Sequence, residues 1–371
     1  MLQEVERHSV NQSPLNSYHE KMGARMVEFA GWSMPLLYRG IVEEHQHTRT
    51  AASLFDVSHM GRIYVTGNDA ERFLDWICTR RLADMPVGAS RYSHICREDG
   101  GILDDVIVSR YEDHFLVVCN GANRDKINAW LTKHASDFAV KLDDRTQRTA
   151  MVAIQGPKAI PTVEKLLSVD LSGLKRYHFT QKIFMTYRYS IFRAGYTGED
   201  GVELVLPVEL VKLALPAIPG ANEGEQVIKP AGLGARDSLR LEAGMPLYGH
   251  ELTEEWDSLT ARQGWCVQLE KDFIGAEAMR RIKADGLKRR IVGLELEGRR
   301  TARQGYAVTA DGEAVGTVTS GVLSPTLGKS IAMALVHAGH ATEGTELAVD
   351  FGGKPTAAKV VKLPFYKLGE S

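Results

Sequence analysis

Residues 90–120 read SRYSHICREDGGILDDVIVSRYEDHFLVVCN, and this stretch decides the fold of the region around it. Residues 90–97 alternate in polarity and end at the turn sequence EDGG at 98–101. A second run, 102–111, leads through a tight ED turn into a third run at 115–120. Short strand-like runs separated by Gly- and Asp-containing turns predict a meander of antiparallel strands.

The middle strand of this meander carries two adjacent carboxylates, Asp104 and Asp105, in an apolar setting. Strand geometry sends neighbouring side chains to opposite faces, so we expect Asp105 to share a face with Leu103 and Ile107. Both faces of the strand are apolar, and a charged group there is costly unless it is paired or used. Either one aspartate is catalytic, or one caps the turn while the other lies at a solvated edge.

Beyond the meander, the sequence predicts a mixture of helices and strands, and therefore an α+β fold. Residues 123–134 have helical spacing, with Ile127, Trp130 and Leu131 on one face. A second α+β unit is expected to begin near Thr149. Its predicted strands are 151–154, 184–192 and 202–206, and its predicted helices are 160–167, 233–243 and 275–284.

The character of the sequence changes near residue 288, where short strand-like runs alternate with Gly-rich turns. This pattern predicts a small barrel or sandwich. We therefore place a domain boundary near Gly286, which divides the chain into regions 1–285 and 286–371. The predicted strands of the second region are 291–296, 305–309, 314–319, 331–336, 346–351 and 357–362.

The segment GYTGEDGVE at 195–203 has three glycines at a spacing of three. Glycines leave room for a backbone to approach a ligand closely, although a plain glycine-rich turn between strands fits the pattern as well. The spacing is not that of a dinucleotide-binding loop. Glu203 lies inside the following apolar strand, where its carboxylate could accept two N–H donors from a planar heterocycle such as a pterin.

The segment GLGARDSLRLEAG at 232–244 is predicted to be helical, with Arg236 and Arg240 on one face and Asp237 three residues before Arg240. One interpretation is a surface helix that carries several ion pairs. The other is that Arg236 binds a carboxylate, since a guanidinium does so with two parallel hydrogen bonds.

Composition and charge exclude several classes of protein. Lys and Arg total 45 and Asp and Glu total 47, so the net charge of −2 gives no electrostatic case for a dedicated nucleic-acid binder. No run approaches the roughly 20 apolar residues of a membrane helix, and residues 1–20 lack a signal-peptide core. We expect a soluble, cytoplasmic protein. The four cysteines form no CxxC pair, and His45, His47 and His59 have no accompanying carboxylate spacing, so no metal site is expected.

Several segments, in order along the chain, together carry a family resemblance. They are AGWSMP at 30–35, LFDVSHM at 54–60, the strand 102–108, the segments 195–203 and 232–243, TSG at 319–321 and SPTLG at 324–328. They resemble the T-protein family of the glycine cleavage system, and the likeness extends from about Pro14 to Tyr366. The resemblance implies a three-lobed cloverleaf with folate in a central channel, in which two lobes are α+β and the third is a small C-terminal β-barrel.

The same resemblance implies an activity. Proteins of this family are aminomethyltransferases, which accept an aminomethyl group carried on the dihydrolipoyl arm of lipoylated H-protein. They transfer its methylene carbon to tetrahydrofolate, giving 5,10-methylene-tetrahydrofolate, ammonia and the reduced arm. We expect tetrahydrofolate as co-substrate and lipoylated H-protein as partner.

The resemblance also assigns site residues. Asp105 matches the catalytic aspartate, Glu203 the pterin-binding glutamate and Arg236 the folate-contacting arginine. The other positions that match the folate channel are Tyr92, Asn120, Tyr196 and Met60, together with Tyr366, which matches a C-terminal tyrosine.

One segment departs from the family pattern. After YGHEL at 248–252 the family usually carries a proline-containing stretch, whereas residues 254–262 read EEWDSLTAR. We expect this departure to affect the local loop and the H-protein contact, and not the folate site. A nearby basic run is either simply solvated or docks an acidic partner. It comprises Arg280, Arg281, Lys283, Lys288, Arg289 and Arg290.

Two alternatives stay open at this point. The first is another folate enzyme of the same fold, such as a demethylase, which would not need the acidic pair, or an oxidising protein, which would need a flavin domain for which the chain has no room. The second is a non-catalytic folate-binding scaffold. Scaffolds of that kind carry Lys-Gly-Cys-x-x-Gly-Gln, whereas residues 271–277 here read KDFIGAE, without a cysteine.

Overall fold

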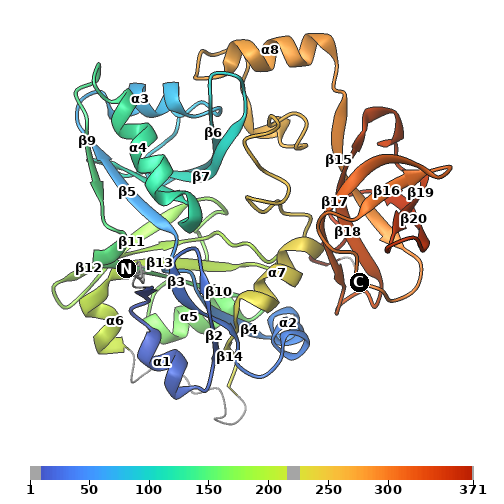
Figure 1. The fold of residues 1–371 in the computed structure, drawn as a ribbon. Coiled ribbons are helices and arrows are strands. Elements are labelled where there is room, and N and C mark those ends of the chain that lie inside the picture. Colours follow the sequence, from blue (N-terminus) through green and yellow to red (C-terminus); the bar gives the residue numbers. More distant parts are fainter. Residues whose placement is uncertain (1–9, 215–225, 370–371) are drawn as a thin grey trace, which may run out of the picture.

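The computed structural model describes residues 10–214 and 226–369. Residues 1–9, part of the segment read for a signal peptide, lie outside the described residues. Figure 1 shows two bodies that combine sheets and helices, and a barrel of strands on the other side of the molecule. The predicted α+β class with a C-terminal barrel is confirmed. None of the helices in the described ranges is long and apolar enough to cross a membrane.

The first body is built on a five-stranded sheet with the order β6-β7-β8-β5-β9. The predicted meander is its β6-β7-β8 part, and β7 is an interior strand as expected. Helix α4 buries Ile127 and Leu131 against the sheet, with Trp130 packed at the edge of the same core. The elements are β5 (Gly61–Thr66), α3 (Ala70–Ile77), β6 (Ser90–Cys96), β7 (Ile102–Arg110), β8 (Phe115–Cys119), α4 (Arg124–His134) and β9 (Lys141–Asp144).

The pairing of β6 with β7 contains a bulge beside the two aspartates. Ile95 pairs with Asp104 and Cys96 pairs with Ile102, so Leu103 has no partner across the strand. A bulge locally breaks the alternation of faces. Leu103 therefore joins the core of this body, and the expectation that it shares a face with Asp105 is wrong.

The second body is a six-stranded sheet with the order β11-β12-β13-β10-β4-β14. The single strand predicted at 184–192 is wrong, because the chain reverses at Met185, which has φ +54°, and forms a hairpin. Strand β4 precedes the whole first body in sequence yet pairs with β10, so the two bodies are interleaved. The elements are α2 (Ile41–Thr50), β4 (Ala52–Asp56), β10 (Thr149–Gln155), α5 (Ala159–Leu167), β11 (Phe179–Phe184), β12 (Tyr187–Phe192), β13 (Gly201–Pro207), α6 (Val208–Ala214) and β14 (Ile228–Pro230).

A small N-terminal sheet and one long-range helix join the parts. Helix α7 (Leu233–Glu242) packs against α2, against β3 and against barrel strands β17 and β18, so it lies where the parts meet. The N-terminal elements are β1 (Asn11–Gln12), α1 (Asn16–Lys21), β2 (Arg25–Phe29) and β3 (Trp32–Leu37). Short 3₁₀ turns occur at η1 (Gly121–Asn123), η2 (Thr146–Arg148), η4 (Gly264–Cys266) and η5 (Ala338–His340).

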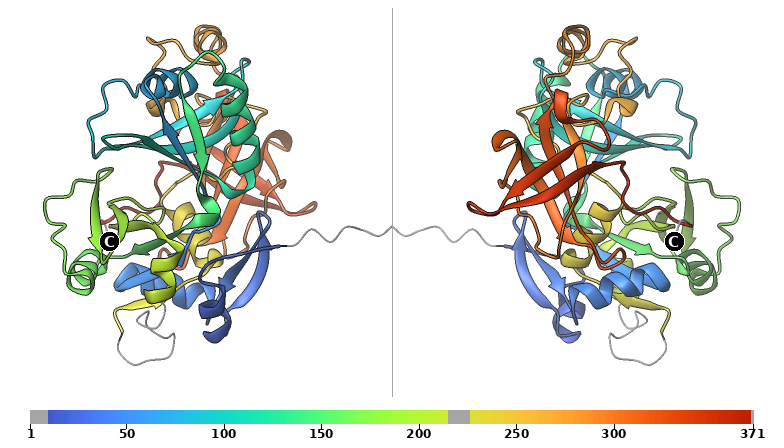
Figure 2. Two further views of the ribbon diagram at one scale, coloured as in Figure 1. Left: turned by 90° about the vertical axis from the view of Figure 1, so that its left-hand side faces the viewer. Right: turned by 90° about the vertical axis from the view of Figure 1, so that its right-hand side faces the viewer.

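The C-terminal strands close into a barrel with the order β15-β18-β17-β16-β19-β20, which decides between the two predicted architectures. Alternating residues such as Val292, Leu294 and Val336 fill its interior. Helix α8 (Ala276–Asp285) runs from the first body toward this barrel (Figure 1), and it is seen nearly end-on at the top of the molecule in Figure 2. A domain boundary near Gly286, between α8 and β15, stays our proposal. The strands are β15 (Arg289–Leu296), β16 (Ala307–Ala310), β17 (Glu313–Leu323), β18 (Ser330–His337), β19 (Glu346–Asp350) and β20 (Pro355–Val361).

Candidate functional site

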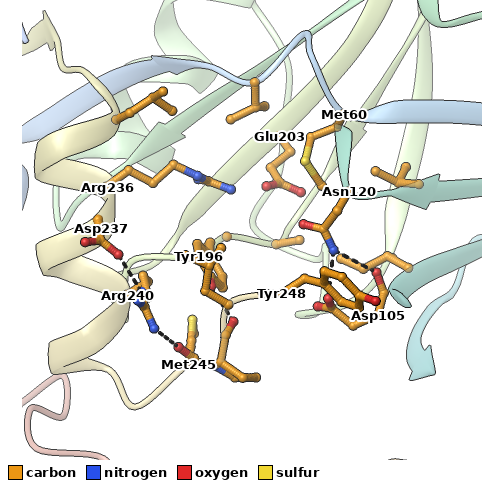
Figure 3. Close-up of a pocket in the computed structure, with 18 of the residues that line it drawn as sticks. Met60, Asp105, Asn120, Tyr196, Glu203, Arg236, Asp237, Arg240, Met245 and Tyr248 are labelled. Carbon is orange, nitrogen blue, oxygen red and sulfur yellow. Dashed lines mark hydrogen bonds and ion pairs between the residues drawn. The ribbon is translucent and has the colours of Figure 1, made fainter. Parts of the chain in front are cut away.

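A cavity of about 580 Å³ lies between the two sheets, α7 and the segment that follows α7. This volume is within the range of small-molecule sites in proteins. Most of the residues singled out in the sequence line it, although they come from separate elements (Figure 3). They are Met60, Tyr92, Asp105, Asn120, Tyr196, Glu203 and Arg236.

One wall of the cavity is formed by the acidic pair of β7 and by Asn120, which follows β8. The Asn120 amide nitrogen lies 2.7 Å from Asp105 Oδ1 and 2.8 Å from Asp104 Oδ1, so it donates to both carboxylates. Asp104 also accepts from the Asn120 backbone N–H at 2.9 Å and from Asn123 Nδ2 at 2.6 Å. Asp104 is fully buried among these donors, whereas Asp105 lines the cavity. We call this set the acidic wall.

The protonation of the acidic wall follows from its burial. Desolvation raises the pKa of Asp105 to about 6, although hydrogen bonds from Asn120 and Tyr92 oppose the rise. Burial, and then the charge of Asp105, raise the pKa of Asp104 well above its usual range. The two carboxyls compete for ionisation, because each is disfavoured by the other's charge. At neutral pH Asp105 is the ionised carboxylate that faces the cavity.

The opposite wall holds Glu203 of β13 and Arg236 of α7, and Figure 3 shows the Arg236 side chain extending from the helix into the cavity on the same side as Glu203. Burial raises the pKa of Glu203 and lowers that of Arg236, and each charge opposes the shift of the other. Arg236 lies 4.8 Å from the centre of the Tyr196 ring, while its Nη1 is buried with no hydrogen-bond partner in the described part of the chain. We call this set the Arg–Glu wall.

Helix α7 does not fit the first of its two interpretations, that of a surface helix. Its residues from Ser238 to Glu242 are buried, and Arg240 is 1% exposed. Arg240 donates to Glu251 at 2.8 Å, to Asp237 at 2.8 Å and to Ser320 of the barrel at 2.8 Å. Arg240 is therefore saturated by internal partners and links α7 to the barrel, whereas Arg236, one turn earlier, keeps donors available for a ligand.

The glycines of segment 195–203 make room mainly for the protein itself. A Cβ on Gly195 would lie 1.7 Å from Gln155 Oε1, and one on Gly201 would lie 2.3 Å from the Ile154 carbonyl oxygen. The plain interpretation as a turn packed against its neighbours is therefore the better one, although Gly195 also borders the cavity. Its neighbour Tyr196 is fixed there, because its hydroxyl donates to the Pro246 carbonyl.

Two groups of predicted residues lie elsewhere. Tyr366 is not among the residues that line the cavity; it donates to Glu199 at 2.7 Å and its ring stacks under Arg49. The three histidines do not converge, since His45 contacts Glu242, His47 contacts the Val227 carbonyl and only His59 borders the cavity. Among the described residues, no group of three or more metal-binding side chains is found.

The structure adds cavity residues that the sequence reasoning missed. His59 is buried, burial lowers its pKa to about 4, and its Nδ1 has no hydrogen-bond partner among the described residues. Trp265 is 57% exposed and stacks on the Tyr92 ring at 5.3 Å. His59 lies within the LFDVSHM motif of the family resemblance, but the sequence pattern suggests for it only a metal-binding role. Trp265 gave no signal, because its exposure becomes visible only in the folded chain.

Comparison with known families agrees with this arrangement. Residues 15–271 match the model described as the GCVT N-terminal domain, and residues 289–367 match that of the glycine cleavage T-protein C-terminal barrel domain. The chain belongs to the glycine cleavage T-protein family. The segment between the two matches contains α8.

Full-length relatives support membership of the T-protein family. An aminomethyltransferase of Herpetosiphon aurantiacus is 46% identical over 96% of this chain and 99% of its own length. One of Rubrobacter xylanophilus is 44% identical over 98% and 96%, respectively. The crystal structure of the glycine cleavage system aminomethyltransferase T from Bartonella henselae superimposes with a TM-score of 0.90 at 36% identity, covering 97% of this chain and 99% of that one.

Proposed function

We propose that this chain, an aminomethyltransferase by its family, transfers the methylene group of aminomethyl-dihydrolipoyl H-protein to tetrahydrofolate in the central cavity. The products are 5,10-methylene-tetrahydrofolate, ammonia and dihydrolipoyl H-protein. The observation that carries the proposal is the pairing of two different walls in one cavity. One wall has polar groups free to hold a ligand, and the other has an ionised carboxylate held in place.

The Arg–Glu wall suits the binding part of this task. A buried carboxylate such as Glu203 accepts N–H donors of a pterin, and the unpartnered Nη1 of Arg236 is a donor for an oxygen or a carboxylate of the folate. Tyr196, which touches Arg236, and Met60 add apolar surface for a flat ring. A buried donor without a partner is costly, so a ligand that supplies the partner gains binding free energy.

The acidic wall suits the chemical part. Positive charge develops on a nitrogen as the methylene carbon is transferred and ammonia leaves. The ionised Asp105 carboxylate stabilises that charge and orients the attacking group, and Asn120 and Tyr92 hold it in position. Because these hydrogen bonds lie within the protein itself, little reorganisation is needed when the charge appears.

The partner is proposed to dock beside the cavity mouth. A second hollow of about 390 Å³ is lined by Arg262, Lys283 and Arg290 and by Trp265, which also lines the central cavity. Arg280 and Arg281 of the predicted basic run are instead paired with Asp272 at 2.9 Å and with Glu277 at 3.2 Å. We call this second hollow the basic groove. We propose that H-protein, which we expect to be acidic, docks on its three cations, Arg262, Lys283 and Arg290.

We also propose that the enzyme is cytoplasmic. Cys78, Cys96, Cys119 and Cys266 are all buried and unpaired, as is common for proteins of a reducing compartment.

A product assay tests the proposed function. The enzyme is mixed with tetrahydrofolate and with H-protein whose lipoyl arm carries the aminomethyl group, and methylene-tetrahydrofolate and ammonia are measured in equal amounts. Both products should require both reactants, and unloaded H-protein is the matched control. Folate binding without turnover would instead favour a scaffold, and turnover of a methylated small molecule without H-protein would favour a demethylase.

A further inference from the structure

A chain of hydrogen-bonded side chains lies behind Asp105 and reaches the segment that departs from the family pattern. Ser258 Oγ is 2.7 Å from His94 Nδ1, and His94 Nε2 is 3.2 Å from the Tyr92 hydroxyl. Tyr92 and Asp105 both line the cavity, and the Tyr92 hydroxyl is close enough to act as a donor that lowers the pKa of the Asp105 carboxyl. Segment 254–262, expected to affect the local loop and the H-protein contact, thus also connects to the cavity residue Tyr92, because Ser258 is bonded to His94 and His94 to Tyr92.

The two inner members of this chain cannot touch a substrate. His94 and Ser258 are both 0% exposed, and neither lines the cavity, whereas Tyr92 and Asp105 do. The Tyr92 ring is held on two sides, by Trp265 stacked at 5.3 Å and by His94 edge-on at 5.5 Å. Any influence of His94 and Ser258 on the reaction is therefore indirect, and the hydrogen bond to the Tyr92 hydroxyl connects them to a residue that does line the cavity.

The direction of the protons along the chain follows from counting donors. An ionised Asp105 carboxylate only accepts, so the single Tyr92 proton has to point at it. The Tyr92 oxygen then accepts from His94, which requires the His94 proton on Nε2. His94 is neutral, since burial lowers its pKa to about 3, so its Nδ1 has a lone pair and accepts from the Ser258 hydroxyl. The nearby Cys96 thiol stays protonated, because burial raises its pKa.

We propose that His94 and Ser258 are positioning residues, which fix the His94 tautomer and thereby hold the Tyr92 hydroxyl as a permanent donor to Asp105. This inference rests on the proposed function only in taking the ionised form of Asp105 as the active one. Without the Ser258 donor, nothing described on that side of His94 favours Nε2–H. In the other tautomer, His94 Nε2 would accept a hydrogen bond from the Tyr92 hydroxyl, which would then no longer donate to Asp105.

The consequence is a shift in the titration of Asp105. The titratable groups around Asp105 are Asp104 on its own strand, Tyr92 and His94 on β6, Tyr196 of the loop before β13 and Cys266 of η4. Loss of one donor to the carboxylate should raise the pKa of Asp105 by about one unit from its value of about 6. Since a raised carboxyl pKa removes the ionised form from the acid side first, the rate should fall several-fold near pH 6 and little above pH 8.

Two spectroscopic measurements and one kinetic measurement test this on the full chain. The ¹⁵N shifts of labelled His94 should place the proton on Nε2 in the unsubstituted protein. The ¹³C-labelled Asp105 carboxyl, assigned by its disappearance in Asp105→Asn, should titrate about one unit higher in Ser258→Ala, while Ser258→Thr, which keeps the hydroxyl, should restore it. In Ser258→Ala, the acid limb of the pH profile of the single-turnover rate should shift upward by the same amount as the pKa of Asp105, while the folate affinity stays unchanged.

Ser93→Ala is the matched control. Ser93 is a fully buried serine on the same strand, bonded to Thr79, to the Arg80 N–H and to the His94 backbone carbonyl, but not to the side chain of Tyr92 or His94. Ser93→Ala should lower the melting temperature of the protein but leave the pKa of Asp105 unchanged. A His94 proton on Nδ1, or an unmoved Asp105 titration in Ser258→Ala, overturns the inference whether or not the enzyme turns over. A moved carboxyl titration with an unmoved rate profile overturns the positioning role in the reaction. Failure of the proposed function itself would instead appear in the unsubstituted protein, which would form no methylene-tetrahydrofolate and no ammonia from tetrahydrofolate and loaded H-protein.

Discussion

The two walls of the cavity use the same kinds of residue in opposite ways. On the acidic wall every carboxylate oxygen described above has an internal donor, so Asp104 and Asp105 are held by Asn120, Asn123 and Tyr92. On the Arg–Glu wall, Arg236 Nη1 is buried with no partner among the described residues, and its attraction to Glu203 acts without a direct bond in that part of the chain.

The difference separates two tasks. A group that is fully bonded within the protein is positioned in advance and is suited to act on charge that appears during a reaction. A group left without a partner is suited to receive one, because the ligand relieves the cost of its burial. If this comparison is right, changes to the acidic wall should reduce turnover and changes to the Arg–Glu wall should reduce affinity.

The largest effect is expected for Asp105→Asn. This variant should fold and bind folate, yet lose about 10²- to 10⁴-fold in single-turnover rate, the scale of a positioned acid–base group. The amide keeps the shape but cannot carry the negative charge. Rate, folate affinity and melting temperature are measured together. A purely structural role would appear as a lowered melting temperature with an activity loss that follows the unfolded fraction, and a folded variant of near-normal rate would remove Asp105 from the chemistry.

The next effect is expected on the Arg–Glu wall. Glu203→Gln and Arg236→Ala should each weaken tetrahydrofolate binding roughly tenfold to a hundredfold, because each removes a charged hydrogen-bonding partner. Calorimetric titration of the free protein measures this. Lys229→Ala, a change at a half-buried cation of β14 outside the central cavity, is the control and should bind normally. Unchanged tetrahydrofolate affinity in both variants would show that the Arg–Glu wall does not bind folate, and the proposed difference between the two walls would be wrong.

Asp104→Asn should have a smaller effect of a different kind. Asp104 accepts three hydrogen bonds, and an amide would turn a donor toward the Asn120 and Asn123 donors. We expect a loss of about 1–3 kcal/mol in the free energy of unfolding, with a smaller change in rate for the folded enzyme. Urea unfolding and single-turnover kinetics on the same preparation separate the two quantities. A rate loss as large as that of Asp105→Asn at full stability would show that the acidic wall acts as one unit.

The smallest effect is expected outside both walls, in the basic groove. Lys283→Ala and Arg290→Ala should each raise the KM for H-protein a few-fold at low salt, and the difference should shrink as salt screens the attraction. Neither should alter folate affinity. Arg281→Ala is the matched control, because Arg281 is already paired with Glu277. A KM that is flat across ionic strength would remove the electrostatic docking but leave the contrast between the two walls untouched.

Local pattern predicted much of the fold because the deciding signals are local. The β6-β7-β8 meander, helices α4, α5, α7 and α8, and all six barrel strands follow from period, turn residues and strand length. The pattern predicts one strand at 184–192 and misses β11, since a reversal at Met185, a non-glycine residue of positive φ, leaves no turn signal. Strand β4 was not assigned to the second sheet, because its partner β10 lies nearly a hundred residues later.

The α+β class and the strand-rich C-terminal region follow from the sequence itself. Its resemblance to a family adds eight candidate site residues, of which the cavity brings seven together. Only the tertiary structure decided which charges are free. Arg236 and Arg240 lie on the same face of one helix, yet Arg240 donates its hydrogen bonds to Glu251 and Ser320 within the protein. Tyr366 likewise donates to Glu199 and does not line the cavity. Ser258 likewise reaches Asp105 only through His94 and Tyr92. The physical reason is that helix and strand periods depend on neighbours along the chain, whereas the pairing and burial of a polar group depend on residues that only folding brings near.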